Sequence, residues 1–313
     1  MLEIGKYLVI AAAVFIFTAF FLELAIVSRV NRTGAAAERA SRVKVSVGSE
    51  APADEPRSPV SPVSPYESVT ARRRGTRGGM AWYATAFVVL ALAMVTFYLV
   101  VRAIETGHGP FANQHEFAIS FVWGILVAHL LFVARFRLRV LALVVMPIAA
   151  LLLVYGMNLD TSVRPLVPAL HNDLMLTTHV IFAVLGYGAA CVAFASAVLW
   201  LVHPKLRKIP HMPKRDVLDE VGYRAAVFTF PLLTIMIALG SYWANVAWGR
   251  FWGWDPKETA SLVTWLLYGA YLHARVAHGW NGKRAAWLLV IAFASVLFTY
   301  FGNHFLGGLH SYA

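Results

Sequence analysis

The chain has 313 residues, of which 59% are hydrophobic and 14% are charged, and its formal net charge is +11. The apolar residues occur in runs of about 20 residues, long enough to cross a bilayer, which excludes an ordinary soluble domain. The short alternating segments typical of a membrane β-barrel are absent, so the composition predicts an all-α polytopic membrane protein.

We predict about eight transmembrane helices, in chain order at residues 4–27, 81–103, 117–134, 139–157, 173–202, 224–246, 257–278 and 285–302. The first is expected to be a retained helix, because its apolar stretch is long for a signal peptide and a poor cleavage site follows it. The chain then divides into an N-terminal transmembrane helix at 1–27, a linker at 28–80 and a membrane domain at 81–313.

The segment between the first two predicted helices differs in kind from the rest of the chain. It contains "SEAPADEPRSPVSPVSPYESVT", which is rich in proline and serine and nearly free of large apolar side chains. Such a composition cannot bury enough apolar surface to fold, so residues 28–80 are expected to form a disordered, basic, cytoplasmic linker.

The basic residues predict the orientation of the helices. Four segments, 28–80, 135–139, 203–224 and 275–284, hold 22 of the 27 lysines and arginines, and eight spans place all four on one side. The positive-inside rule assigns that side to the cytoplasm of a bacterial cytoplasmic membrane. Both termini and the loop at 243–258 then lie on the outer side. The same distribution explains the net charge without a nucleic-acid partner.

Cys191 is the only cysteine, and it lies inside an apolar run. The chain therefore has no disulfide framework, no C-x-x-C redox pair and no C-x-x-C-H haem-attachment site of its own.

The stretch "WANVAWGRFWGWDPKETASLVTWLLYGAYLHAR" contains an unusual concentration of aromatic side chains. Trp248, Trp252 and Trp254 fall within seven residues and are separated by Gly249 and Gly253. An aromatic belt at the membrane interface is one interpretation. Belt residues are usually scattered over several helices, and glycine permits close approach of the backbone. The pattern therefore favours a platform for a flat aromatic ligand.

The "DPKE" sequence that follows predicts the start of a helix. Asp255 is expected at the N-cap and Glu258 at the third helical position, in capping-box geometry. Capping explains both carboxylates without a catalytic role. Arg250 and Lys257 add positive charge that suits the carboxylates of a ligand, although either side chain could equally be solvated.

Four of the 11 histidines are candidates for metal ligands. His179 and His310 are predicted at the outer side, where two neutral imidazoles could hold a haem iron from both faces. His273 lies about 22 Å deeper at helical rise, which indicates a second, inner site or a plain hydrogen bond. His129 is predicted at comparable depth and could pair with it. Each imidazole taken alone could be a hydrogen-bonded core residue.

The sequence "WGRFWGWDPKETASLVTWLLYGAYLHAR", with "LMLTTHV" and "GLHSY", resembles the tryptophan-rich WWD signature of haem-handling proteins. The flanking motifs make it similar to the CcsA/ResC branch of system II cytochrome c biogenesis, called CcsB in some lineages. The resemblance covers about residues 81–313. It implies a cytochrome c synthase subunit that exports haem b to the outer face and attaches it covalently to apocytochrome c C-x-x-C-H motifs.

The resemblance also implies roles for particular residues. His179 and His310 match the external axial ligands that act as the catalytic pair, and His273 matches the inner ligand, whereas His129 is not part of the pattern. The haem would rest on the loop with Trp248, Gly249, Arg250, Trp252, Gly253, Trp254, Asp255 and Lys257. The implied partners are a ResB/CcsB-type membrane subunit that supplies the second inner ligand, apocytochrome c and proteins of a thiol-reducing pathway.

Three other functions remain open at this point. The first is a haem-delivery chaperone that binds haem at the same loop without ligating it. The second is a b-type multi-haem electron-transfer protein, which would need a complete inner histidine pair. The third is a transporter or structural membrane protein without haem, in which the tryptophans form an interfacial belt.

Overall fold

The structure is a computed structural model that describes residues 2–45, 79–163, 173–206, 212–302 and 306–310. The regular structure of these residues consists of eight α-helices and one 3-10 turn, and no strand occurs among them. This confirms the predicted all-α class.

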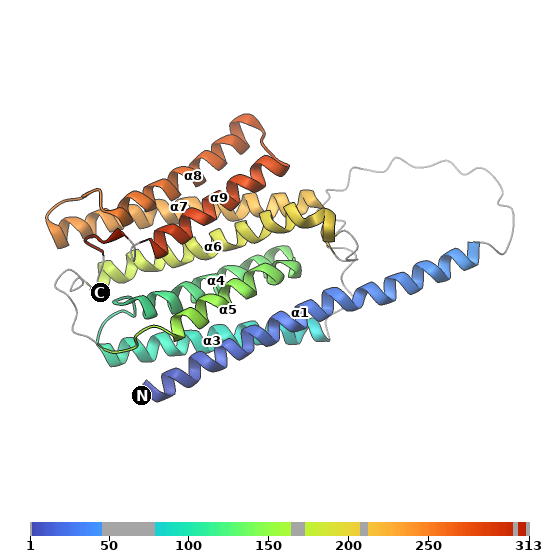
Figure 1. Cartoon of the computed structure of the whole chain (residues 1–313), viewed down its shortest axis with the longest axis horizontal. Helices are drawn as coiled ribbons and strands as arrows, with labels where there is room; N and C mark the ends of the chain where they lie inside the picture. The colour runs from blue at the N-terminus through green and yellow to red at the C-terminus, as the bar shows by residue number, and fades with distance from the viewer. Residues whose placement is uncertain (1, 46–78, 164–172, 207–211, 303–305, 311–313) are drawn as a thin grey trace.

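Each predicted span corresponds to one helix, although α1 extends well beyond its predicted end and α7 begins well before its predicted start. They are α1 (Leu2–Val45), α3 (Met80–Thr106), α4 (Gln114–Phe136), α5 (Ala142–Met157, after a 3-10 turn at Arg139–Leu141), α6 (Asp173–Leu206), α7 (Arg215–Trp248), α8 (Pro256–His278) and α9 (Gly282–Phe301). Figure 1 shows them side by side as an elongated bundle, with the C-terminal part of α1 extending beyond one end. Within this bundle α6 packs against α4, α5, α7 and α9, and it is the most buried of the candidate spans.

Seven of the eight described helices are long and apolar enough to cross a membrane, and α8 does not meet the same criterion. With 23 residues α8 is as long as α4, and it lies beside α7 and α9 in the bundle. Its lower hydropathy has a structural reason, because the face that it buries carries Thr264, Tyr268 and Tyr271. The fold is therefore that of a multi-pass helical membrane protein with α8 as part of the bundle.

The two ends of the bundle differ in charge. The start of α1, the end of α9 and the connection between α7 and α8 lie at one end (Figure 1). The opposite end carries the short connection at 137–141, the start of α7 and the connection between α8 and α9, where most basic residues of the described chain occur. The assignment of these ends to sides of the membrane stays a prediction from the basic residues.

The predicted end of the first transmembrane segment, residue 27, agrees with the candidate membrane span Ile4–Ser28, but the helix itself continues past that span. The sequence places the end of the helix at residue 27, whereas α1 continues to Val45. Its last turns read "AAAERASRVKV", and alanine, glutamate and arginine are strong helix formers, so helix propensity outweighs the loss of hydrophobicity there. The rest of the predicted disordered linker, residues 46–78, lies outside the described residues.

Helices α4 and α6 cross at glycines, which brings the two backbones into contact. A Cβ on Gly124 would lie 2.1 Å from the carbonyl oxygen of Val184, and one on Gly188 would lie 2.1 Å from the carbonyl oxygen of Gly124. No side chain larger than hydrogen fits at either position. Glycine at this crossing fixes the position of α6 relative to α4, as small residues do between membrane helices.

Candidate functional site

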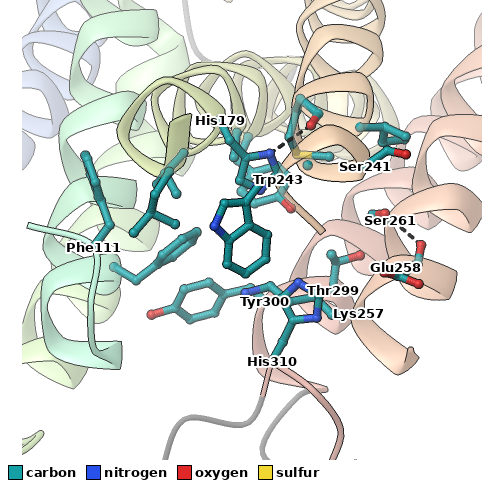
Figure 2. A pocket seen from close by; sticks show the side chains of 18 of the residues that line it. Phe111, His179, Ser241, Trp243, Lys257, Glu258, Ser261, Thr299, Tyr300 and His310 are labelled. Atoms are coloured by element: carbon teal, nitrogen blue, oxygen red, sulfur yellow. Dashed lines mark hydrogen bonds between the residues drawn. The ribbon is translucent and has the colours of Figure 1, made fainter. Parts of the chain in front are cut away.

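A cavity of about 420 Å³ opens at the end of the bundle where α7 joins α8. Side chains from α4, α6, α7, α8 and α9 line it together with the C-terminal segment at 306–310, and they include His179 and His310. Figure 2 shows these two histidines on different walls, with Trp243 between them in the view. The volume lies in the range of small-molecule and cofactor sites, roughly 300–1,000 Å³. We call this cavity the His179–His310 pocket.

A backbone carbonyl of the neighbouring helix fixes the imidazole of His179. Its Nδ1 lies 2.8 Å from the carbonyl oxygen of Met236 on α7. Because a carbonyl can only accept a hydrogen bond, Nδ1 carries the proton and Nε2 keeps its lone pair. The ring also requires Gly240, since a Cβ at that position would lie 2.7 Å from Cε1 of His179.

The imidazole of His310 is fixed by a carboxylate. Its Nδ1 donates to Oδ2 of Asp255 at 2.8 Å, and the backbone N–H of Leu309 donates to the other oxygen at 2.6 Å. Gly308, with φ at +148°, lies so close that a Cβ would be 2.3 Å from Oδ1 of Asp255. His310 therefore has the same tautomer as His179, with the lone pair on Nε2.

Asp255 also begins α8, as the sequence predicts. Its Oδ2 accepts from the backbone N–H of Lys257 at 3.1 Å, and Oε2 of Glu258 accepts from the backbone N–H of Asp255 at 3.1 Å. These bonds form the predicted capping box. One carboxylate thus joins the first turn of α8 to the C-terminal segment that carries His310.

Burial of the His310 ring lowers its pKa below 6.5, and the hydrogen bond to Asp255 opposes this effect only in part. Burial tends to raise the pKa of Asp255, but the hydrogen bond and charge of His310 outweigh it, and the pKa lies below 3.8. In a window just below pH 6.5 the unfolded chain binds a proton at His310 that the folded chain does not. The folded state therefore loses stability as the pH falls through that window, and the imidazole stays neutral above it.

The tryptophans of the predicted platform have three different positions. Trp252 lines the His179–His310 pocket. Trp248 packs edge-on against the ring of His310, with ring centroids 4.8 Å apart. Trp254 is 69% exposed, and its φ of +57° turns it out of the pocket, although its ring stays 5.9 Å from that of Trp252.

A fourth tryptophan, which is not among the predicted site residues, belongs to the pocket. Trp243 is only 2% exposed, lines the pocket and has its ring 5.7 Å from that of His310. Met236, Gly240 and Trp243 follow one another at intervals of four and three residues, so they share one face of α7. This spacing is the sequence signal that could have assigned all three to the site.

The glycines and cations of the loop also have distinct positions. Gly249 ends α7 in the left-handed conformation at a φ of +73°. Gly253 packs against Arg250, whose Nε would be 2.9 Å from a Cβ there, and its N–H donates to Glu258. Lys257 lines the pocket, and its Nζ lies 5.1 Å from the ring centroid of Phe117. Lys257 is therefore the predicted cation that faces the cavity.

His273 lies near the other end of α8 and is exposed on the surface of the bundle. Its ring is 5.4 Å from that of His278. His129 is 4% exposed inside α4, which does not form a packed pair with α8. An exposed His273 is accessible to another subunit. His171 and His304 lie outside the described residues.

The chain is similar to several known proteins. A family model described as "Cytochrome C assembly protein" matches residues 111–310. The cytochrome c biogenesis protein CcsA of Guillardia theta is 36% identical over 251 residues, which cover 72% of this chain and 83% of that protein. CcsA of Gloeobacter violaceus is 32% identical over 289 residues, covering 73% and 85%.

The fold also resembles a solved structure of the cytochrome c heme lyase CcmF. The TM-score is 0.58 at 19% sequence identity, and the match covers 95% of this chain and 46% of the CcmF chain. At this identity the likeness concerns the fold alone. The family match spans the helices and the C-terminal segment that build the His179–His310 pocket. The chain therefore belongs to the cytochrome c assembly protein family.

Proposed function

We propose that this chain exports haem to the outer face of the membrane and attaches it covalently to the C-x-x-C-H motifs of apocytochromes c. Haem b is the substrate, and the His179–His310 pocket is the place where it is held. The observation that carries the proposal is the shared tautomer of the two histidines: each Nδ1 donates to a fixed acceptor, which puts the lone pair that would bind iron on Nε2.

The surroundings of the two imidazoles suit a porphyrin. Trp243 and Trp252 contribute flat apolar surface to the wall of the pocket, and the half-buried side chain of Lys257 contributes a cation for a propionate. The relatives named CcsA support a role in cytochrome c biogenesis.

The chain's own residues then have a positioning task. Each thioether forms when the S–H of a substrate cysteine adds across a vinyl double bond, so one S–C bond and one C–H bond form and nothing is oxidised. Two axial ligands orient the vinyl edge toward the incoming thiols. One external imidazole must leave the iron when the histidine of the substrate motif arrives. The thiols come from the substrate, which is consistent with a chain whose only cysteine, Cys191, is buried.

We further propose that haem reaches this pocket from an inner site at His273. The imidazole lies near the basic end of the bundle and is exposed, so a ligand from a ResB/CcsB-type subunit can approach the same iron. His129 is buried in α4, which does not pack against α8 to any extent, and this supports a ligand from the partner over His129.

A maturation assay with the partner subunit and an apocytochrome tests the proposal. We expect His179→Ala and His310→Ala each to abolish covalent haem attachment, with partial recovery in added imidazole. His115→Ala is the matched control, because His115 donates to the carbonyl of Gly156 and bonds Tyr98, away from the pocket. Normal attachment in both pocket variants would contradict the proposal, and haem binding without attachment in the wild type would favour a haem-delivery chaperone.

A further inference from the structure

Helix α8 buries a polar face and exposes an apolar one. Polar side chains recur at intervals of three and four residues along the buried face, at Lys257, Ser261, Thr264, Tyr268, Tyr271 and Arg275. We call this row the polar seam. Its central members Thr264, Tyr268 and Tyr271 are at most 1% exposed, whereas Leu266 and Val276 on the outer face are 52% and 75% exposed. A membrane helix turns polar residues inward where the interior supplies partners for them.

The protein itself supplies only some of those partners. The hydroxyl of Thr264 donates to the carbonyl of Ala260 or pairs with the hydroxyl of Thr299 on α9, 3.0 Å away. The hydroxyl oxygens of Tyr268, Tyr271 and Tyr300 are fully buried and have no hydrogen-bond partner among the described residues. Buried hydroxyls are almost always paired, and internal water is the usual partner when protein atoms are not.

The polar seam runs between two cavities. Ser261 and Tyr300 line the His179–His310 pocket at one end. At the other end Arg275 lines a polar cavity of about 660 Å³, where it donates to Asp219 and to the carbonyl of Trp280. The 18 residue steps from Lys257 to Arg275 rise about 27 Å, which is close to the thickness of the hydrocarbon core.

We propose that the polar seam binds a file of internal water molecules that joins these two cavities through the bundle. Each tyrosine hydroxyl can donate one hydrogen bond and accept others, so successive hydroxyls on one helix face can be bridged by single waters. The file places Lys257 at one end and Asp219 with Arg275 at the other in one hydrogen-bonded network. The file begins at Lys257 in the proposed haem pocket, but Tyr268 and Tyr271 do not line that pocket, so the proposal goes beyond the proposed function.

Radiolytic hydroxyl-radical footprinting with mass spectrometry tests the proposal on the haem-free whole chain in lipid nanodiscs. Water bound next to a side chain generates radicals that modify it, whether or not the side chain reaches the surface. We expect Tyr268 and Tyr271 to be modified several-fold faster than Tyr98. Tyr98 is a matched internal control, because it is 6% exposed and its hydroxyl is bonded to His115. Equal, slow modification of all three tyrosines would overturn the proposal.

A variant provides the second measurement. Tyr268→Phe removes the central hydroxyl of the polar seam, so the modification of Tyr271 should slow toward the rate of Tyr98. Thr229→Val is the control, because Thr229 is equally buried but its hydroxyl donates to the carbonyl of Ala225 on α7, away from the seam. A modification rate of Tyr271 that is unchanged by Tyr268→Phe, or lowered as much by Thr229→Val, would overturn the proposal.

Discussion

Asp255 combines two tasks in one side chain, because it begins α8 and also orients the imidazole of His310. The sequence predicts the first task from the spacing of Asp255 and Glu258. The second depends on the path of the C-terminal segment, which returns to α8 and donates to Asp255 through the backbone of Leu309 as well. A loop residue that looks like a simple helix cap is therefore also a positioning residue for a proposed iron ligand.

Asp255→Asn separates these two tasks. Asparagine is as good an N-cap as aspartate, so α8 should keep its first turn. The charge that fixes the His310 tautomer is lost, and changes of this kind usually weaken metal binding about 10–100-fold. Titration of the purified chain with haem should show that loss, while thermal unfolding stays close to wild type. Unchanged haem affinity would show that Asp255 acts only as a cap.

Gly240→Ala tests whether the orientation of His179 matters. The new methyl group would lie 2.7 Å from Cε1 of His179, so the ring must leave its bond to Met236. We expect loss of the low-spin haem absorption bands in this variant. Gly186→Ala on α6 is the matched control, because its Cβ would lie 3.3 Å from the flexible side chain of Leu233. Normal spectra in Gly240→Ala would contradict the assignment of His179.

Among the elements, α4 and α6 depend most on an exact fit, since two glycines bring their backbones into contact. Gly188→Ala would force α4 and α6 apart and move both His179 on α6 and Phe117 on α4. Overpacking of this kind costs roughly 1–3 kcal/mol. We expect a lower melting temperature and a lower yield of folded protein. Gly269→Ala, with 3.2 Å to the ring of Phe230, should be milder, and equal effects of the two changes would argue against a special crossing.

The helices show what a sequence can and cannot predict. Long apolar runs predict all eight described α-helices, and "DPKE" predicts the capping box. The helical continuation of α1 to Val45 was missed, because polar residues there conceal a strong helix propensity. The partners of His179 were missed too, because they depend on how α7 is rotated against α6. Trp254 points outward, and its own backbone has the left-handed conformation. The composition of the loop does not predict that conformation.

The whole molecule separates two histidine sites along its length. The His179–His310 pocket lies at one end of the bundle, and His273 lies near the basic end of α8. The eight predicted membrane spans place most basic residues at one end of the bundle, and the positive-inside rule predicts that this end faces the cytoplasm. That sidedness also predicts the convergence of His179 and His310, which both line the pocket although they are far apart in the sequence.

His273→Ala tests the link between the two sites in the complex with the partner subunit. If haem enters at His273, we expect this variant to reduce the haem recovered in the His179–His310 pocket, although that pocket itself is unchanged. His278→Ala is the control, because His278 is exposed on the same helix with its ring 5.4 Å away. Pyridine haemochrome assays of the purified complexes give the measurement. Wild-type haem content in His273→Ala would contradict entry at this site.

The most direct measurement is the absorption spectrum of haem bound to the whole chain, purified with its partner, in the wild type and in His179→Ala and His310→Ala. We expect six-coordinate low-spin haem in the wild type, because both imidazoles line the pocket and carry their lone pair on Nε2. Each variant should lose that signature and recover it in added imidazole. A spectrum that neither substitution changes would contradict the central claim that these two histidines hold the iron.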